Sequence, residues 1–139
     1  MKKFIPLLLV CLAIICFCSS CGMFEKNPVE GHYQLYEPEG MVGYICYWDP
    51  DWSTVVQVDR CDLYLYSDGK YTIHYVNSGS WEKSEDDPNK IILTASDSKV
   101  FSRMELAFDE RWQELEMINT DTTNPDFEFS GVFKFYSSL

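Results

Sequence analysis

Short runs of β-branched and aromatic residues, each ended by a turn sequence, recur along the chain and most restrict how it can fold. Phe, Tyr and Trp make up 16% of the 139 residues, and such residues fit the pleated, half-buried surface of a strand. Pro, Gly, Asn and Asp separate the runs and are typical of turns. The predicted strands span 31–36, 42–48, 54–59, 62–67, 70–76, 79–83, 90–94 and 127–135. This pattern predicts an all-β domain built as an antiparallel meander.

The strongest local turn signal lies in the sequence LYLYSDGKYTIHYV. The Asp-Gly pair at 68–69 favours a two-residue hairpin loop, because both positions can adopt a positive φ. Such a loop would place Tyr66 opposite Tyr71 and Tyr64 opposite Ile73. A longer loop with a bulge would shift this register. Both faces of the hairpin are largely apolar, so we expect it at the centre of the fold, with one face suited to lining a cavity.

Residues 101–118 fit two structures. A helical stripe would consist of Phe101, Met104, Phe108, Trp112, Leu115 and Ile118. A strand pair would instead alternate Met104, Leu106 and Phe108 before a turn, and Leu115 and Met117 after it. The hairpin continues the meander and is the favoured interpretation, with the helix as the alternative.

The first 20 residues have the form of a secretory signal peptide. Lys2 and Lys3 precede an apolar run over 4–17, which as a helix would rise about 21 Å and fall short of a hydrocarbon core about 30 Å thick. The run ends at Ser-Ser-Cys-Gly, which resembles the lipobox of bacterial lipoproteins, although Cys18 stands where that family usually has Leu, Val or Ile. The resemblance implies cleavage before Cys21 and a lipid such as palmitate on its thiol. An uncleaved helical anchor is the alternative.

This resemblance also predicts where the protein works. The lipid on Cys21 would hold it to a membrane of the bacterial cell envelope. Residues 21–29 would then form a tether, and residues 30–139 the folded domain.

Several loose motifs occur in the same order along residues 30–136. They are an opening Gly-x-Tyr strand (Gly31, Tyr33), an Asp-Gly-Lys-Tyr hairpin (68–71), a Gly-x-Trp strand (Gly79, Trp81), an Ile-x-Leu strand (Ile91, Leu93) and an aromatic closing strand. In these features the chain resembles the small lipocalin-like lipoproteins of bacterial envelopes. The resemblance implies an antiparallel barrel or half-barrel of about eight strands. The Cys-x-x-Cys pair of the related copper-stress lipoproteins is missing, so copper sensing is not implied.

Two cysteines stay available once the signal peptide is removed and Cys21 is acylated. These are Cys46 and Cys61, and an even pair in an exported protein favours a disulfide because the compartment is oxidising. Closing a loop of about 15 residues would stabilise the fold by roughly 3 kcal/mol. We therefore expect a disulfide between them, with two buried, unpaired thiols as the alternative.

The charge of the chain is strongly negative. It carries 11 basic and 22 acidic residues, and removal of Lys2 and Lys3 with the signal peptide leaves 9 against 22, a net charge of −13. This balance argues against nucleic acid and against adsorption on anionic headgroups, which both require Lys and Arg. It would attract a cationic partner, such as a basic protein, or a divalent metal, or it serves only to keep the protein soluble.

The sequence lacks the patterns that carry catalysis. No His-Glu-x-x-His, Gly-x-Ser-x-Gly, P-loop or dinucleotide-binding glycine pattern occurs. His32 and His74 lie on different predicted strands without a metal-ligand partner. The stretch NTDTTNPD (119–126) offers oxygen ligands but not the twelve-residue calcium loop, so a turn is the better interpretation. We expect no enzyme activity, no cofactor and no metal site.

The stretch YICYWDPDW looks most like a recognition site. Aromatic rings beside carboxylates suit sugar stacking or a protein contact, and the candidate binding residues are Tyr47, Trp48, Asp49, Asp51 and Trp52. Core packing followed by a turn is the alternative, in which Trp52 alone is expected outside. We therefore expect a non-catalytic binding module for a small apolar or glycan ligand or an envelope protein. The alternatives are an acidic inhibitor or immunity-type lipoprotein that blocks a cationic hydrolase, and a purely structural lipoprotein.

Overall fold

The computed structural model describes residues 29–139, which form eleven β-strands. They are β1 (Gly31–Tyr36), β2 (Tyr44–Asp49), β3 (Thr54–Asp59), β4 (Asp62–Leu65), β5 (Lys70–Ile73), β6 (Asn77–Lys83), β7 (Lys90–Ala95), β8 (Arg103–Asp109), β9 (Glu114–Asp121), β10 (Glu128–Ser130) and β11 (Val132–Ser137). These residues contain no helix, so the all-β prediction is confirmed and the helical alternative for 101–118 is wrong: β8 and β9 form the hairpin. The expected signal peptide and Cys21 lie outside the described residues.

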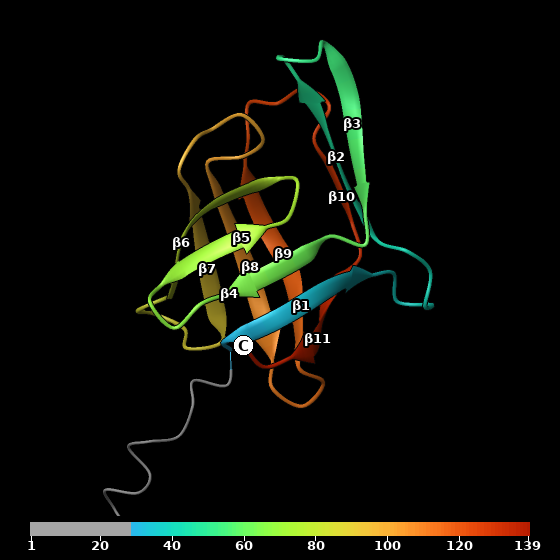
Figure 1. The fold of residues 1–139 in the computed structure, drawn as a ribbon. Helices are drawn as coiled ribbons and strands as arrows, with labels where there is room; N and C mark the ends of the chain where they lie inside the picture. Colours follow the sequence, from blue (N-terminus) through green and yellow to red (C-terminus); the bar gives the residue numbers. More distant parts are fainter. Residues whose placement is uncertain (1–28) are drawn as a thin grey trace, which may run out of the picture.

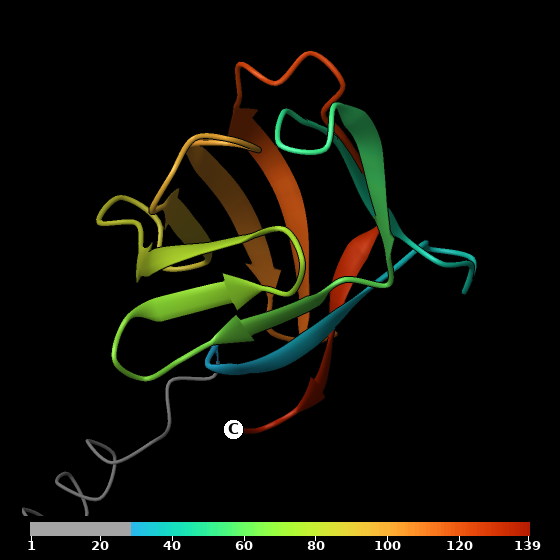
Figure 2. The same ribbon diagram turned by 45° about the horizontal axis from the view of Figure 1, so that its top comes forward.

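Eight of the strands close into an antiparallel barrel, as a small lipocalin-like barrel requires. Their order is β1-β11-β9-β8-β7-β6-β5-β4, and β4 pairs again with β1 (Figure 1). The other three strands form a second sheet in the order β10-β2-β3, which rises from one end of the barrel (Figure 1). Seen more from above, this second sheet stands along one side of the ring of barrel strands (Figure 2). No described residue belongs to a helix long and apolar enough to cross a bilayer.

Gly131 separates the barrel from the second sheet near the C-terminus. The predicted strand 127–135 is in fact two strands, because β10 pairs with β2 whereas β11 pairs with β1 and β9. Gly131 has a φ of +117°, and a Cβ at this position would lie 2.5 Å from the carbonyl oxygen of Tyr36. Only glycine fits such a conformation and such a close approach. The chain therefore changes sheets at this residue.

The β4–β5 hairpin has a longer loop than the Asp-Gly pair suggested. The N–H of Tyr66 donates to the carbonyl of Lys70 (2.9 Å), and Gly69 has a φ of +81°, as in a three-residue loop with a bulge. The opposing residues are Leu63 with Ile73, Tyr64 with Thr72, and Leu65 with Tyr71. The predicted register is therefore wrong by one residue. The observed register buries both leucines and leaves Tyr64 and Tyr66 outside.

Apolar side chains fill the barrel. Fully buried large residues include Tyr33, Tyr71, Phe101, Phe133, Leu63, Leu65 and Met104, and an eight-stranded barrel is just wide enough for its own side chains. The inner face of the β4–β5 hairpin thus packs into a core, and Tyr71 of this face also borders an open hollow. The core residues of the described part of the chain lie between Val29 and Phe133, and a chain of residues 22–139 contains all of these.

Candidate functional site

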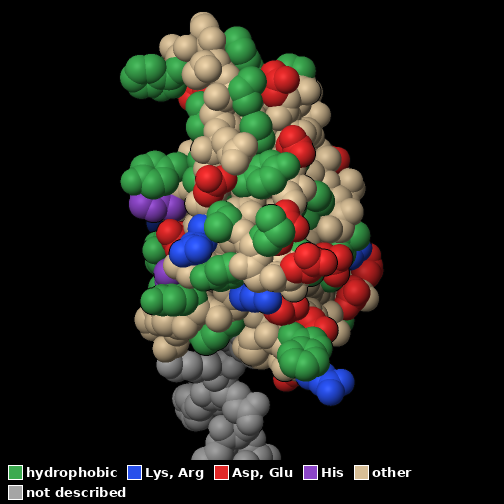
Figure 3. Space-filling model, turned by 90° about the vertical axis from the view of Figure 1, so that its right-hand side faces the viewer, with side chains coloured by type: hydrophobic (Ala, Val, Ile, Leu, Met, Phe, Trp, Pro, Cys, Tyr) green, Lys and Arg blue, Asp and Glu red, His purple; other side chains and the backbone are tan. Residues whose placement is uncertain are grey.

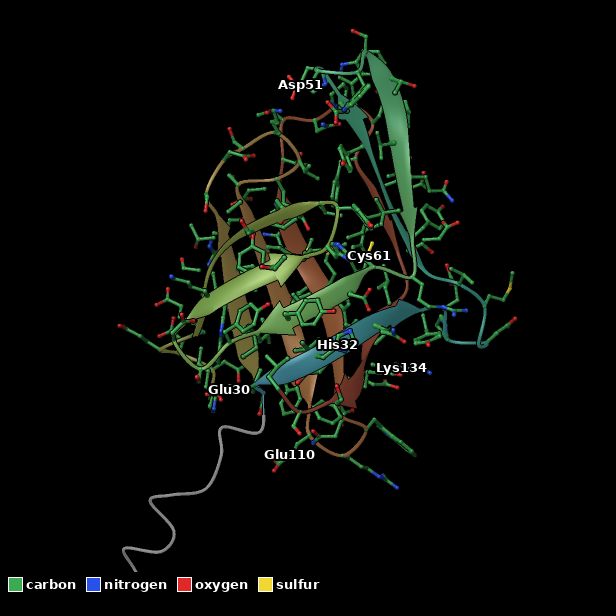
Figure 4. All side chains as sticks on the ribbon, viewed as in Figure 1. Glu30, His32, Asp51, Cys61, Glu110 and Lys134 are labelled. Atoms are coloured by element: carbon green, nitrogen blue, oxygen red, sulfur yellow. The ribbon has the colours of Figure 1, made fainter. Side chains whose placement is uncertain are left out.

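The predicted recognition residues lie on β2 and on the turn between β2 and β3, at the end of the second sheet farthest from the barrel. Asp51 marks this turn in Figure 4. The carboxylate of Asp49 accepts the N–H of Asp51 (2.9 Å), and Ser53 has a φ of +48° before β3 begins. Trp52 is 77% exposed, the highest value among the large hydrophobic residues of the described chain. The prediction that Trp52 lies outside is confirmed.

Tyr47 and Trp48 point to opposite faces of the second sheet, since side chains alternate along a strand. Tyr47 is 8% exposed on the inner face, and its hydroxyl donates to the carbonyl of Tyr75 (2.9 Å). Burial raises the pKa of Tyr47, with a smaller contribution from the charge of Asp49. Tyr47 is therefore a core residue. Trp48 lies half-buried on the outer face.

Asn124 fixes the second sheet to the loop between β9 and β10. Its Oδ1 accepts the N–H of Trp48 (2.9 Å), and its Nδ2 donates to the carbonyls of Trp48 (2.8 Å) and Lys99 (2.8 Å). The sequence predicts only a turn at Asn124. No local signal reveals a contact between residues 76 positions apart.

Asp51 forms an ion pair with a lysine of its own chain. The Nζ of Lys99 forms an ion pair with Asp51, and this hydrogen bond raises the pKa of Lys99. Asp49 is likewise engaged with the N–H of Asp51. The two carboxylates that were predicted to meet a partner thus also hold the turn together.

The outer face of the second sheet is aromatic and acidic. The strand registers place on it Tyr44, Cys46 and Trp48 from β2, Val55, Gln57 and Asp59 from β3, and Glu128 from β10. The hydroxyl of Tyr44 donates to Glu128 (2.7 Å), which raises the pKa of Tyr44. The side of the molecule that carries this sheet shows hydrophobic side chains with more Asp and Glu than Lys and Arg among them (Figure 3).

The expected Cys46–Cys61 disulfide is not formed, and both cysteines are free. Cys46 lies on the outer face opposite Gln57, whereas Cys61 is 1% exposed, with its Sγ donating to the carbonyl of Val58 (3.1 Å). Burial raises the pKa of Cys61 to about 12. The alternation of β2 explains the difference, because it turns Cys46 away from the core in which Cys61 is buried.

A second group of rings lies on the outer wall of the barrel, where no local sequence pattern predicts a cluster. His32 stacks on Tyr64 (ring centroids 4.4 Å apart), Tyr64 on Tyr66 (6.1 Å), and Tyr136 meets His32 edge-on (5.0 Å). The Nε2 of His32 lies 2.7 Å from the Oδ1 of Asp62. The stacked pairs cover part of the His32, Tyr64 and Tyr66 ring faces, whereas Tyr136 is 65% exposed. These rings link β11, β1 and β4 on the outside of the barrel.

The two largest of the surface hollows described are lined by none of the predicted recognition residues. An open hollow of about 670 Å³ borders β5, β6 and β7, and another of about 640 Å³ borders the β8–β9 turn. Residues 29–139 contain no group of three His, Cys, Asp or Glu that could hold a metal ion. Comparisons of the chain with protein-family models, curated proteins and solved structures found no match.

Proposed function

We propose that this protein is a lipid-anchored lipoprotein of the bacterial cell envelope that binds a protein partner through its second sheet, without catalysis. The Ser-Ser-Cys-Gly junction supports the anchor, which would be a lipid on Cys21 after removal of residues 1–20. The barrel would then be the scaffold that presents the second sheet above the membrane.

The packed interior supports binding on the outside. Small-ligand sites are usually concave and enclose most of the ligand, but the interior of this barrel is occupied by its own side chains. The second sheet offers what protein interfaces use, namely exposed aromatic residues with polar groups around them. A protein therefore suits this surface better than a small apolar ligand.

Trp52 is the observation that carries the proposal. Its ring is 77% exposed at the end of a hairpin whose turn is held by Asp49, by the Asp51–Lys99 ion pair and by Asn124. An exposed tryptophan on a turn that is already held in place costs little backbone entropy on binding, and tryptophan is enriched among the residues that dominate binding energy.

The test compares two exposed tryptophans. Trp112 is 63% exposed in the β8–β9 turn, whose Glu110 lies at the opposite end of the molecule from Asp51 (Figure 4). The soluble 22–139 chain, Trp52→Ala and Trp112→Ala are each used to capture proteins from an envelope extract. We expect a partner that the parent chain and Trp112→Ala retain and Trp52→Ala loses. Identical captured sets for all three chains would contradict the proposal.

Binding kinetics of the captured partner then separate the short-range and long-range contributions. Trp52→Ala is expected to raise the dissociation rate, since it removes a buried contact. Asp49→Asn with Asp51→Asn is expected to lower the association rate and its salt dependence, because charge steers encounter and is screened beyond about 8 Å at physiological ionic strength. Association that is insensitive to salt would contradict a role for charge.

The second candidate is an acidic inhibitor of a cationic hydrolase, and the net charge of −13 after cleavage favours it. It predicts that the 22–139 chain slows a basic peptidoglycan hydrolase at low salt, with Trp52→Ala less effective than Trp112→Ala. A hydrolase rate that does not change at any salt concentration would exclude this candidate. If the capture experiment also finds no partner, a purely structural role is the remaining candidate function.

A further inference from the structure

β3 is an edge strand with an open side. It lies at the end of the order β10-β2-β3 and nearest the viewer among these strands in Figure 1. Its sequence, TVVQVD, has high strand propensity and contains neither Pro nor Lys. Proteins usually protect such edges with Pro, Lys, a bulge or a covering loop. Within residues 29–139 no strand or loop pairs with the open side of β3.

The register identifies which backbone groups are unpaired. The N–H of Arg60 donates to the carbonyl of Gly43 (2.7 Å), so the residue after β3 faces β2. In an antiparallel pair this direction alternates, and the N–H and C=O groups of Val55, Gln57 and Asp59 therefore point away from β2. This edge offers three donors and three acceptors at the spacing of a strand.

The side chains along the edge are accessible and differ between its two faces. Val55 is 47% exposed, and the Nε2 of Gln57 donates to Asp59 (2.7 Å) along the strand on the outer face. Val56 and Val58 pack against the core on the inner face. A strand added here would meet apolar side chains on one face and the carboxylate of Asp59 on the other.

Charge decides which kind of strand fits this edge. The guanidinium of Arg60 lies over the ring of Tyr36 (5.4 Å to the centroid), so it is engaged with the barrel and not with Asp59. A second copy of the chain would bring a further net charge of −13 to the same face. A segment with alternating basic and apolar residues would instead place its cations beside Asp59 and its apolar side chains beside Val56 and Val58.

We propose that β3 takes up a basic, extended segment of the partner protein as a fourth strand of the second sheet, a form of strand addition. This inference rests on the proposed function, because it describes how a partner that contacts Trp52 is also held by strand pairing. Backbone hydrogen bonds of the edge would supply the pairing, and Asp59 the preference for basic sequences.

The probe is a capped synthetic peptide in which Lys and Val alternate, added to the soluble 22–139 chain. Amide hydrogen exchange gives a residue-specific result. We expect the amides of Val55, Gln57 and Asp59 to become protected, whereas those of Val56 and Val58, already bonded to β2, change little. A Glu–Val peptide and a peptide with methylated backbone nitrogens on the pairing edge are expected to give no protection. Equal protection by the methylated peptide would overturn the proposal.

Gln57→Pro and Gln57→Thr form the matched pair of variants. Proline removes an N–H that faces solvent and is tolerated at such edge positions, whereas threonine keeps the N–H. We expect Gln57→Pro to weaken peptide binding about tenfold, since a carbonyl of the peptide then lacks its donor, and Gln57→Thr to bind like the parent chain. Equal affinity of the two variants would overturn the proposal.

Asp59→Lys supplies a variant that keeps the backbone intact. We expect it to weaken the Lys–Val peptide about threefold and to improve the Glu–Val peptide. Analytical sedimentation tests whether a second copy of the chain occupies the β3 edge instead. If the parent chain is a dimer and Gln57→Pro makes it monomeric, the edge binds a second copy, and the proposal of a basic segment is overturned. If Trp52→Ala abolishes capture of the partner and Gln57→Pro does not, strand addition is wrong while the proposed function stands.

Discussion

Replacing Asn124 with alanine should loosen the second sheet and destabilise the whole domain. The change removes four hydrogen bonds of the side chain: two donated to the carbonyls of Trp48 and Lys99, and two accepted from the N–H groups of Trp48 and Asp126. At about 1 kcal/mol net for each bond, the sum is about 4 kcal/mol. We expect a loss of about 2 kcal/mol in the free energy of unfolding, because Lys99 and the loop are open to water, which replaces part of the bonding. For a domain of this size this lowers Tm by about 8 °C.

Thermal unfolding of the soluble 22–139 chain, followed by circular dichroism, measures this effect. Thr123→Ala is the matched control, because Thr123 is an exposed neighbour in the same loop, and we expect it to change Tm by less than about 2 °C. Asn124→Asp keeps the acceptor for the Trp48 N–H but loses both donors, so an intermediate Tm is expected. If Asn124→Ala and Thr123→Ala unfold at the same temperature, Asn124 does not hold the second sheet in place.

Cys46 is expected to react with Ellman's reagent in the folded 22–139 chain. Cys61 is expected to react only in denaturant, because burial raises its pKa to about 12. Equal reaction rates of the two thiols would contradict the burial of Cys61. Gly131→Ala is expected to lower the free energy of unfolding by about 2–3 kcal/mol. Gly40→Ala is the control and is expected to lower it less, because a Cβ at Gly40 would meet no atom within 4 Å. Equal denaturation midpoints of the two variants would refute the close approach at Gly131. In the full chain, Cys21→Ser is expected to abolish incorporation of labelled palmitate and to release the protein from the membrane fraction. Label that still enters the variant would rule out Cys21 as the acylated residue.

Alternation of apolar residues predicted much of the fold. The bounds of β1 and β3 agree with the predicted strands 31–36 and 54–59, and Met104, Leu106 and Phe108 all point into the core. These features depend on a period of two within one strand, which a sequence shows directly. The helical stripe in the same region was weaker evidence, because strand pairing on both sides favours another hairpin.

The errors share a physical cause, which is that contacts distant in sequence decided the outcome. Both a two-residue and a three-residue loop accept Gly69 at positive φ, so only the burial of Leu63 and Leu65 selects the register. A cysteine count cannot show that β2 turns Cys46 outward while Cys61 faces the core.

The candidate site was predicted in part for the same reason. Trp52 follows a turn and was correctly expected outside. The buried position of Tyr47, the hydrogen bonds of Asn124 to Trp48 and the ion pair of Asp51 all depend on how β2 packs against distant loops. None of these contacts leaves a pattern in the local sequence.

Site-specific photo-crosslinking in living cells tests the central claim most directly, because it uses the full chain in its own envelope. A photoreactive phenylalanine analogue replaces Trp52 in one variant and Trp112 in the other, and adducts are detected after irradiation. The account predicts a discrete protein adduct at position 52, which Gln57→Pro in the same chain weakens, and none of that mass at position 112. No adduct at position 52, or the same adduct at both positions, would contradict the claim that the second sheet is the binding surface.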